Sequence, residues 1–365
     1  MLYNHFRNYG CRLNIDYSYK GMRIAVLENE FLRVSILIDK GTDIFEFLYK
    51  PKDIDFMWLS PWGLNSPAKF VPSVSSREGN FMDFYEGGWQ EIIPNFGFGG
   101  KFFGEIEEGL HGEVCLIPWD CQVMEDSPSE VSVRFSVRSY RTPFYLEKIL
   151  TLKKDDPKLY IHEKLKNEGY VDINLMWTHH PAFGGAFLDE SIVIDVPKND
   201  IELILKKRNN GECFEIPDKT INKWPVFPGY AGHLTDFSKS PLVLNDKKTL
   251  TDEICIGNLT DGWYAVTNLK KKTGFGMRWD KNIFPYIWLW RMYGKNSSHS
   301  PWYGRAECMA LELCSSFSPF GLTDAIKNGT ALALAPMQEI QTSFMAIGFE
   351  KDSRVSKINS EGGVI

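Results

Sequence analysis

The feature that most constrains this chain is an alternation of apolar and polar residues with a period of two. In residues 131–138, Val131, Val133, Phe135 and Val137 alternate with serines and arginines. This pattern is typical of a β-strand with one face in the core and one in water. It recurs at 22–28, 31–38, 144–152, 159–165, 171–177, 191–196, 263–267, 274–279, 286–291, 308–313 and 338–349. No segment carries a long apolar stripe at helical spacing, so the sequence predicts an all-β fold.

The spacing of these segments predicts how the strands are joined. Short turn sequences such as Asp155-Asp156-Pro157 separate neighbouring segments, which favours antiparallel pairing. We therefore expect a large antiparallel β-sandwich of two sheets. A chain of 365 residues often forms two domains, but we find neither a linker nor a repeat and predict one domain over 1–365. Two segments rich in proline and glycine, near 59–80 and 198–246, are expected to form rim loops.

Composition excludes several classes of function. The net charge is -6 and the charged residues are mixed along the chain, so a nucleic-acid partner is not expected. Seven cysteines, an odd number, without a C-x-x-C pair argue against a disulfide framework or a zinc ribbon. We find neither a leader pattern in residues 1–14 nor an apolar run of membrane-span length. These features predict a cytoplasmic protein with no membrane partner, no metal and no cofactor. A second copy of the chain, forming a homodimer, is the protein partner left open.

Three histidines are candidates for chemistry. His111 lies between two glycines, which let the backbone bend and approach a ligand; an ordinary loop residue is the alternative. His179 and His180 follow the apolar segment 171–177. Adjacent side chains on a strand point to opposite faces, so only one of the two is expected to face a given site. One buried and one solvated histidine is the alternative for that pair.

Glu312 is the most informative carboxylate. It lies in the apolar segment 308–314 and shares a face with Ala310 and Cys314. An ionised carboxylate in such a strand needs a partner or a catalytic purpose. A structural ion pair, with Arg291 or Arg305, is the alternative to catalysis.

Other segments are suited to binding a sugar. Residues 85–97 combine glycines, an aromatic side chain and amide side chains, and an amide can donate and accept hydrogen bonds as a hydroxyl does. The segment 288–291 adds two tryptophans and an arginine. Flat aromatic rings can stack on the C–H faces of sugars, although most tryptophans belong to a core.

These pieces, in this order, resemble the galactose mutarotase (aldose 1-epimerase) superfamily. The segments that bear the resemblance are 87–95, 110–112, 178–184 and 311–312, and it extends over about residues 22–350. It implies a β-supersandwich fold and cofactor-independent interconversion of the α and β anomers of a free sugar. It also implies that Glu312 is the general base and His180 the general acid, with His111 assisting at the ring oxygen. For sugar binding we select Gln90, Trp89, Asn95, His179, Phe183, Trp290 and Arg291.

The chain departs from the superfamily pattern where the sugar is recognised. His180 is followed by Pro-Ala-Phe-Gly rather than x-Tyr-Phe-Asn, and Leu313 replaces the usual Thr or Pro. The usual arginine before the first histidine is not evident, and Asp261 and Asp280 are the candidates for a sugar-recognising aspartate. The sugar is therefore left open among neutral, phosphorylated, acidic and sulfonated forms; Arg278, Arg291 and Arg305 are the candidates for contacting an anionic group.

Two other functions remain open. One is a non-catalytic carbohydrate-binding member of the same fold. The other is a glycoside hydrolase or lyase, which would need a second carboxylate opposite Glu312. Glu91, Glu113 and Glu307 are the candidates for that carboxylate.

Overall fold

The computed structural model describes residues 7–68, 79–104, 106–197, 200–201, 222–228, 234–240, 250–293, 302–318 and 320–365. Most of the predicted rim loop 198–246 and part of 59–80 lie outside these residues. Two large antiparallel sheets contain most of the strands of the described chain, as the period-two pattern predicts. The all-β sandwich is thus confirmed, while the prediction of one domain over 1–365 stays a prediction.

The first sheet has eleven strands. Its order is β1 (Arg12–Asn14), β3 (Met22–Glu28), β4 (Leu32–Leu37), β5 (Ile44–Tyr49), β7 (Trp89–Ile92), β15 (Thr178–Phe183), β25 (Cys308–Cys314), β24 (Tyr286–Tyr293) and β21 (Leu250–Ile256), with β2 (Ser18–Tyr19) beside β3 and β6 (Ile54–Asp55) beside β5.

The second sheet has eight strands. Its order is β10 (Asp120–Asp126), β11 (Glu130–Arg138), β12 (Phe144–Lys153), β13 (Lys158–Asn167), β27 (Glu339–Phe349), β23 (Thr273–Arg278), β22 (Trp263–Asn268) and β16 (Ile192–Asp195).

Short elements complete the fold. They are the pairs β8 (Gly100–Phe103) with β9 (Ile106–Glu108), β14 (Ile173–Leu175) with β26 (Leu332–Leu334), β17 (Asp200–Ile201) with β18 (Asn222–Lys223), and β19 (Val226–Pro228) with β20 (Leu234–Asp236), and the helices α1 (Gly79–Phe84) and α2 (Leu322–Lys327). No helix among the described residues is long and apolar enough to cross a membrane.

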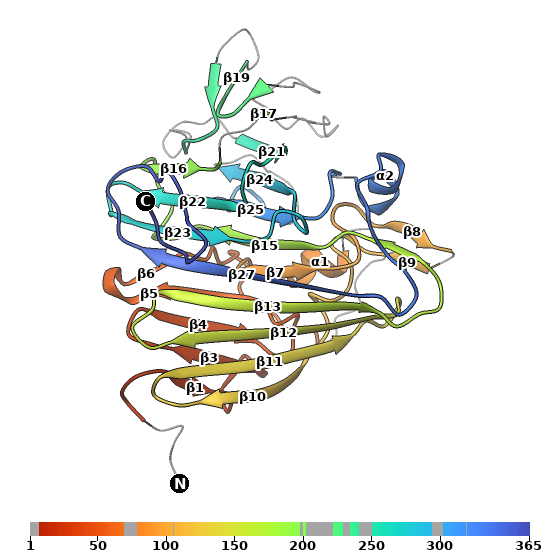
Figure 1. Ribbon diagram of the computed structural model, residues 1–365, viewed down its shortest axis with the longest axis horizontal. Coiled ribbons are helices and arrows are strands. Elements are labelled where there is room, and N and C mark those ends of the chain that lie inside the picture. Colours follow the sequence, from red (N-terminus) through yellow and green to blue (C-terminus); the bar gives the residue numbers. More distant parts are fainter. Residues whose placement is uncertain are drawn as a thin grey trace.

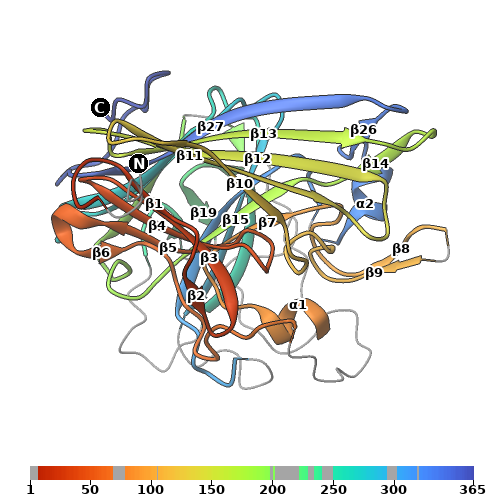
Figure 2. The same ribbon diagram turned by 90° about the horizontal axis from the view of Figure 1, so that it is seen from below.

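The two sheets stack as layers. Figure 1 shows β11, β12, β13 and β27 side by side, and Figure 2 shows them as one layer above β3, β4 and β5. The main core lies between the layers, where Leu27 and Leu311 of the first sheet join Val133 and Ile161 of the second. Burial of these alternating apolar side chains is the main stabilising term of such a sandwich.

The sequence prediction is wrong about one strand. The sequence predicts that the segment 171–177 forms one strand with the two histidines at its end. The structure instead has the short strand β14 and then β15, which contains His179 and His180. Both histidines therefore occupy strand positions inside the eleven-stranded sheet, with side chains on opposite faces.

Candidate active site

The register of β15 and β25 brings the two central candidates together. It pairs His179 with Leu313, so the next residue, His180, lies opposite Glu312 in the antiparallel ladder. Leu313 belongs to the core between the sheets. His180 and Glu312 consequently lie on the other face of the eleven-stranded sheet, away from the eight-stranded one.

The same face extends this pair into a row across four strands. Gln90 of β7 pairs with His180, and Glu312 pairs with Trp288 of β24. The resulting order, Gln90, His180, Glu312 and Trp288, places an amide, an imidazole, a carboxylate and an indole about one strand spacing apart, close to 5 Å.

The His180–Glu312 pair is buried and in contact. His180 Nε2 lies 3.3 Å from Glu312 Oε1, and the two side chains are 6% and 2% exposed. Burial lowers the pKa of His180 to about 4. Burial, reinforced by the negative charge of Glu253, raises the pKa of Glu312 well above its usual value. Both shifts disfavour the charged forms, as a dry environment does.

One mobile proton serves this pair. A carboxylic acid beside a neutral imidazole holds the same number of protons as a carboxylate beside an imidazolium. While it holds this one proton, the pair therefore offers one proton donor and one acceptor, and a ligand that stabilises charge can shift the proton from Glu312 to His180.

His111 lies above the row on a loop with tight backbone contacts. Its φ is +62° and that of Gly112 is +68°. A Cβ on Gly112 would lie 2.3 Å from the Ile93 carbonyl oxygen, so only glycine fits. The sequence analysis attributed the flanking glycines to approach of a ligand; for Gly112 the structure shows approach to the backbone of Ile93.

Ring contacts fix the position of the His111 imidazole. The centroid lies 5.5 Å from that of His180, 5.4 Å from that of Phe96 in a stacked arrangement, and 4.4 Å from that of Phe81. Imidazoles from two distant segments, His111 and His180, thus lie next to each other.

Aromatic rings surround a floor of small residues next to the row. Ala182 and Ala310 pair across β15 and β25 on the site face. The ring centroids of Tyr85 and Trp290 lie 5.8 Å and 5.9 Å from that of His180. The sequence analysis selected Trp290 and missed Tyr85. Trp58 and Trp302 pack in the same cluster as the two alanines.

Several buried polar atoms on this face have no hydrogen-bond partner within the described chain. They are Tyr85 Oη, Gln90 Oε1, His180 Nδ1 and Glu312 Oε2. Burial raises the pKa of Tyr85 well above its usual value, so its hydroxyl remains a donor. Native proteins seldom leave buried polar groups unpaired, and such groups call for a missing partner. Here that partner must both donate and accept hydrogen bonds.

Four of the residues selected for sugar binding lie on the opposite face. They are Trp89, His179, Phe183 and Arg291. Trp89 and Phe183 belong to the core between the sheets, as do Leu289 and Tyr293, which lie two positions either side of Arg291 on the same face of its strand. The Arg291 guanidinium lies 4.2 Å from the Phe237 ring centroid. The structure does not bring these four to the site, because odd and even positions of a strand point in opposite directions.

His179 belongs to a buried polar cluster instead. Its Nδ1 accepts from Trp89 Nε1 at 3.3 Å, and its Nε2 lies 2.9 Å from Glu163 Oε2. Lys148 Nζ lies 2.9 Å from Glu91 Oε2. Glu91, Glu163 and His179 have ligand atoms close enough to hold a metal. However, both ring nitrogens of His179 are engaged and the Lys148 ammonium already supplies positive charge, so the donor set does not fit one.

Asn95 has a structural position. Its Nδ2 donates to the carbonyls of Gly97, Phe98 and Gly109, and its Oδ1 accepts from Leu322 N at 2.9 Å. Both ends of the amide are used in joining two loops to α2. Asn95 thus supports the loop that ends at His111 rather than facing a ligand.

The structure adds a carboxylate that the sequence analysis missed. Glu253 of β21 pairs with Trp290 of β24, and cross-strand partners share a face. Glu253 is thus on the site face, two strands from Glu312. The alternation of Glu253 with Cys255 beside apolar Ile254 and Ile256 is the same signal that identified Glu312.

The remaining candidates lie elsewhere. Asp261 pairs with Arg278, and with Asp280 they line a hollow of about 680 Å³ that also contains residues of β12, β13 and β27. Arg305 and Glu307 line another hollow, of about 470 Å³, beside Trp58.

The sequence analysis offered an ion pair with Arg291 or Arg305 as the structural explanation for the buried Glu312. In the structure the partner of Glu312 is His180. Among the carboxylates considered for hydrolysis, Glu91 pairs with Lys148 and Glu113 accepts from the backbone of Tyr140 and Arg141.

Solved structures identify the class of fold. A protein from Klebsiella pneumoniae, provisionally assigned as an aldose 1-epimerase, superposes with a TM-score of 0.68 at 15% identity, covering 94% of this chain and 84% of that one. A galactose mutarotase related enzyme from Lactobacillus acidophilus gives 0.56 at 14% identity, covering 92% and 100%. A galactose mutarotase-like protein from Lactobacillus casei gives 0.57 at 14% identity, covering 89% and 100%. The chain has the galactose mutarotase-like fold.

The sequence family is narrower. The model of DUF4432, a domain of unknown function, matches residues 19–214, more than half of the chain, and the protein belongs to this family. No curated protein matches the chain.

Proposed function

We propose that this protein is a mutarotase that interconverts the α and β anomers of a free sugar by general acid–base catalysis. The observation on which this rests is the buried His180–Glu312 pair next to a small-residue floor. Mutarotation needs one base for the anomeric hydroxyl and one acid for the ring oxygen at the same moment, and no net proton change.

The reaction follows from the pair in its ionised form. Glu312 takes the proton of the anomeric hydroxyl while His180 gives a proton to the ring oxygen, and the ring opens to the aldehyde. The C1–C2 bond rotates and the two residues exchange roles as the ring recloses on the other face of the carbonyl. Burial excludes bulk water, which strengthens the interaction of both groups with developing charge.

Sugar binding is supported by the polar atoms that lack partners. The hydroxyls of a sugar both donate and accept, so one ligand can satisfy Tyr85, Gln90 and the free atoms of the pair. Trp290 offers a ring for the C–H face of the sugar, His111 lies within reach of the ring oxygen, and Glu253 supplies a carboxylate for further hydroxyls.

The substitution Glu312→Gln tests the proposal. It keeps the shape of the side chain and removes the base, so mutarotation of the best substrate should fall by about 10²–10⁴-fold. Exchange NMR over neutral aldoses, sugar phosphates, uronic acids and sulfonated sugars measures it. Glu307 is an exposed carboxylate five residues before Glu312. Glu307→Gln makes the same chemical change there, so it is the matched control and should retain full activity.

Two outcomes would contradict the proposal. Wild-type rates in Glu312→Gln would remove this residue from the chemistry. Binding of sugars by the wild-type protein without acceleration of mutarotation would favour the non-catalytic carbohydrate-binding member of the fold instead.

A further inference from the structure

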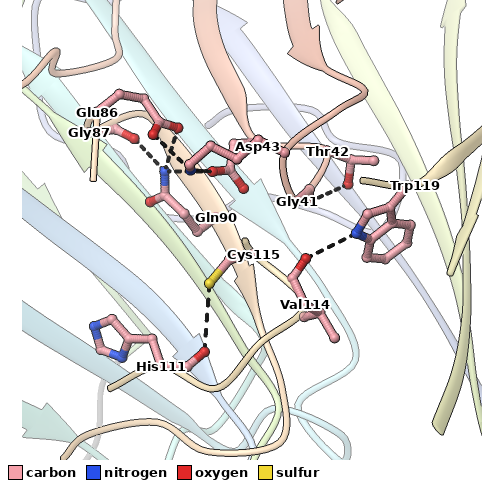
Figure 3. A network of polar contacts seen from close by, with 11 residues as sticks. Gly41, Thr42, Asp43, Glu86, Gly87, Gln90, His111, Val114, Cys115 and Trp119 are labelled. Carbon is pink, nitrogen blue, oxygen red and sulfur yellow. Dashed lines mark hydrogen bonds and ion pairs between the residues drawn. The ribbon is translucent and has the colours of Figure 1, made fainter. Parts of the chain in front are cut away.

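A network of buried charges lies beside Gln90. Lys40 Nζ bonds Asp43 and lies 2.7 Å from Glu86 Oε2, and none of the three side chains is more than 1% exposed (Figure 3). Burial raises the pKa of Asp43 well above its usual value, and the neighbouring charge of Glu86 adds to that effect. Two carboxyl groups thus share one ammonium and are held close together away from water.

These groups determine which way the Gln90 amide points. Gln90 Nε2 donates to the Gly87 carbonyl and lies 3.3 Å from Glu86 Oε1 and 3.5 Å from Asp43 Oδ2. Turning the amide over would place its oxygen against three acceptors, which is repulsive. Figure 3 shows Gln90 Oε1 directed away from Asp43 and Glu86, and this buried atom has no partner within the described chain.

The turn that supplies Lys40 and Asp43 is conformationally costly. Gly41 and Thr42 have φ angles of +61° and +53°, and a β-branched residue is rare in that region. A Cβ on Gly41 would lie 2.5 Å from the Cys115 carbonyl oxygen. Strain of this kind, combined with three buried ionisable groups, persists where a particular geometry is maintained.

We propose that the Lys40–Asp43–Glu86 network is a positioning device that fixes Gln90 as a hydrogen-bond acceptor beside His180 and thereby selects the ligand. The proposal rests on the proposed function only in taking the ligand to be a sugar. Gln90 is one strand from His180 on the same face, so Oε1 accepts from a ring substituent close to the reacting centre. That substituent must be a donor, either a hydroxyl or an N–H group.

Deoxy and fluorinated sugars test this selection. A deoxy sugar lacks the donor, and a fluorinated sugar replaces it with a group that cannot donate. At one ring position both analogues should bind about ten- to a hundred-fold more weakly than the parent sugar, because Oε1 is left buried and unpaired. The probes are D-galactose and D-glucose with their monodeoxy and monofluoro analogues at carbons 2, 3, 4 and 6, measured by calorimetry.

Glu86→Gln separates positioning from structure. Because the new amide keeps its oxygen toward Lys40, its NH2 group faces Gln90 Nε2. One of the three acceptors that hold the Gln90 amide is then replaced by a donor, and the amide is no longer held firmly in one orientation. The parent-to-analogue affinity ratio should then fall. Glu46→Gln, a neutralising change on β5 outside this network, should leave the ratio unchanged. A general loss of stability would not alter such a ratio selectively.

A ligand-free measurement makes the test independent of the sugar. The Gln90 side-chain NH2 signals, assigned by their absence in Gln90→Met, should exchange slowly with water in the wild-type protein and in Glu46→Gln. Freely exchanging signals would overturn the proposal, as would full binding of every fluorinated analogue or an unchanged ratio in Glu86→Gln. If sugars bind without mutarotation, the proposed function fails while this inference stands; if no probe sugar binds, the exchange measurement alone decides.

Discussion

Two histidine–glutamate pairs lie back to back on β15, one on each face of the sheet. His179 contacts Glu163 at 2.9 Å towards the core, and His180 contacts Glu312 at 3.3 Å on the other face. Burial lowers the pKa of both histidines, to about 3 and about 4, and raises the pKa of both glutamates. By burial and by charge the two pairs are nearly alike.

They differ in how their other atoms are used. Both ring nitrogens of His179 are hydrogen-bonded, and the cluster around it includes the Glu91–Lys148 ion pair. In contrast, His180 Nδ1 is buried and unpaired within the described chain, and aromatic rings surround the imidazole. Each glutamate keeps one buried oxygen without a partner within the described chain, Glu163 Oε1 and Glu312 Oε2. A perturbed pKa and an unpaired carboxyl oxygen therefore do not distinguish the two pairs. The unpaired ring nitrogen of His180 does, because a ligand can complete it.

Exchanging the adjacent histidines for asparagine should give opposite results. His180→Asn should reduce mutarotation by about 10²–10⁴-fold, because the acid is lost, with a smaller loss of stability than His179→Asn, because His180 Nδ1 has no hydrogen bond to lose within the described chain. His179→Asn should lower the free energy of unfolding by about 2 kcal/mol or more, because Glu163 and Trp89 lose a partner and a void is left. Urea unfolding and exchange NMR on the same samples measure both.

The comparison fails if the two variants behave alike. In particular, full activity in His180→Asn together with severe unfolding would make both pairs structural. His162→Asn, a change on the outer face of β13 where the imidazole contacts Ser343, is the control and should be nearly neutral in both measurements.

The His179–Glu163 pair on the core side should also make the free energy of unfolding depend on pH. Burial raises the pKa of Glu163 from 4.5 to about 8, so the folded state keeps a proton that the unfolded state releases. The stabilisation that comes from this bound proton is therefore complete below pH 4.5. It is lost as pH rises through 8, at up to about 1.4 kcal/mol per pH unit.

Glu163→Gln should remove that part of the slope. Between pH 6.5 and 8, where the histidine shifts no longer contribute, the urea midpoint of the variant should fall less steeply than that of the wild type. Parallel curves would show that Glu163 is already ionised at neutral pH in the folded protein.

Much of the fold could be predicted from the sequence, because period two directly reports which face of a strand is buried. The same reasoning identified Glu312 as anomalous and predicted that only one of His179 and His180 would face the site. The alternation alone did not reveal which of the two histidines this is. That depends on the register between β15 and β25, which decides which histidine lies opposite Glu312. Register across β7, β15 and β25 is a long-range property that local patterns do not encode.

The errors in the site have a related cause. Trp89, Phe183 and Arg291 are near site residues in sequence but one position out of phase with them on their strands. Tyr85 lies outside any periodic segment and comes to His180 through the fold. Lys40 and Asp43 belong to a turn some fifty residues before Gln90, and only the three-dimensional structure joins them to its amide.

The smallest expected effect concerns Glu253, the carboxylate on the site face two strands from Glu312. Its negative charge raises the pKa of Glu312, so Glu253→Gln should lower that pKa. In the proposed mechanism the His180–Glu312 pair acts only while it holds one proton, which it loses when Glu312 ionises at high pH. The alkaline limb of the pH–rate profile should therefore move to lower pH, by about one unit or less for charges two strands apart. Glu339→Gln, an exposed change on the other sheet, should leave the limb in place. A limb that moves to higher pH, or does not move, would mean that Glu253 does not act on Glu312 through its charge. Glu312 would then owe its raised pKa to burial alone, as Glu163 does on the core side.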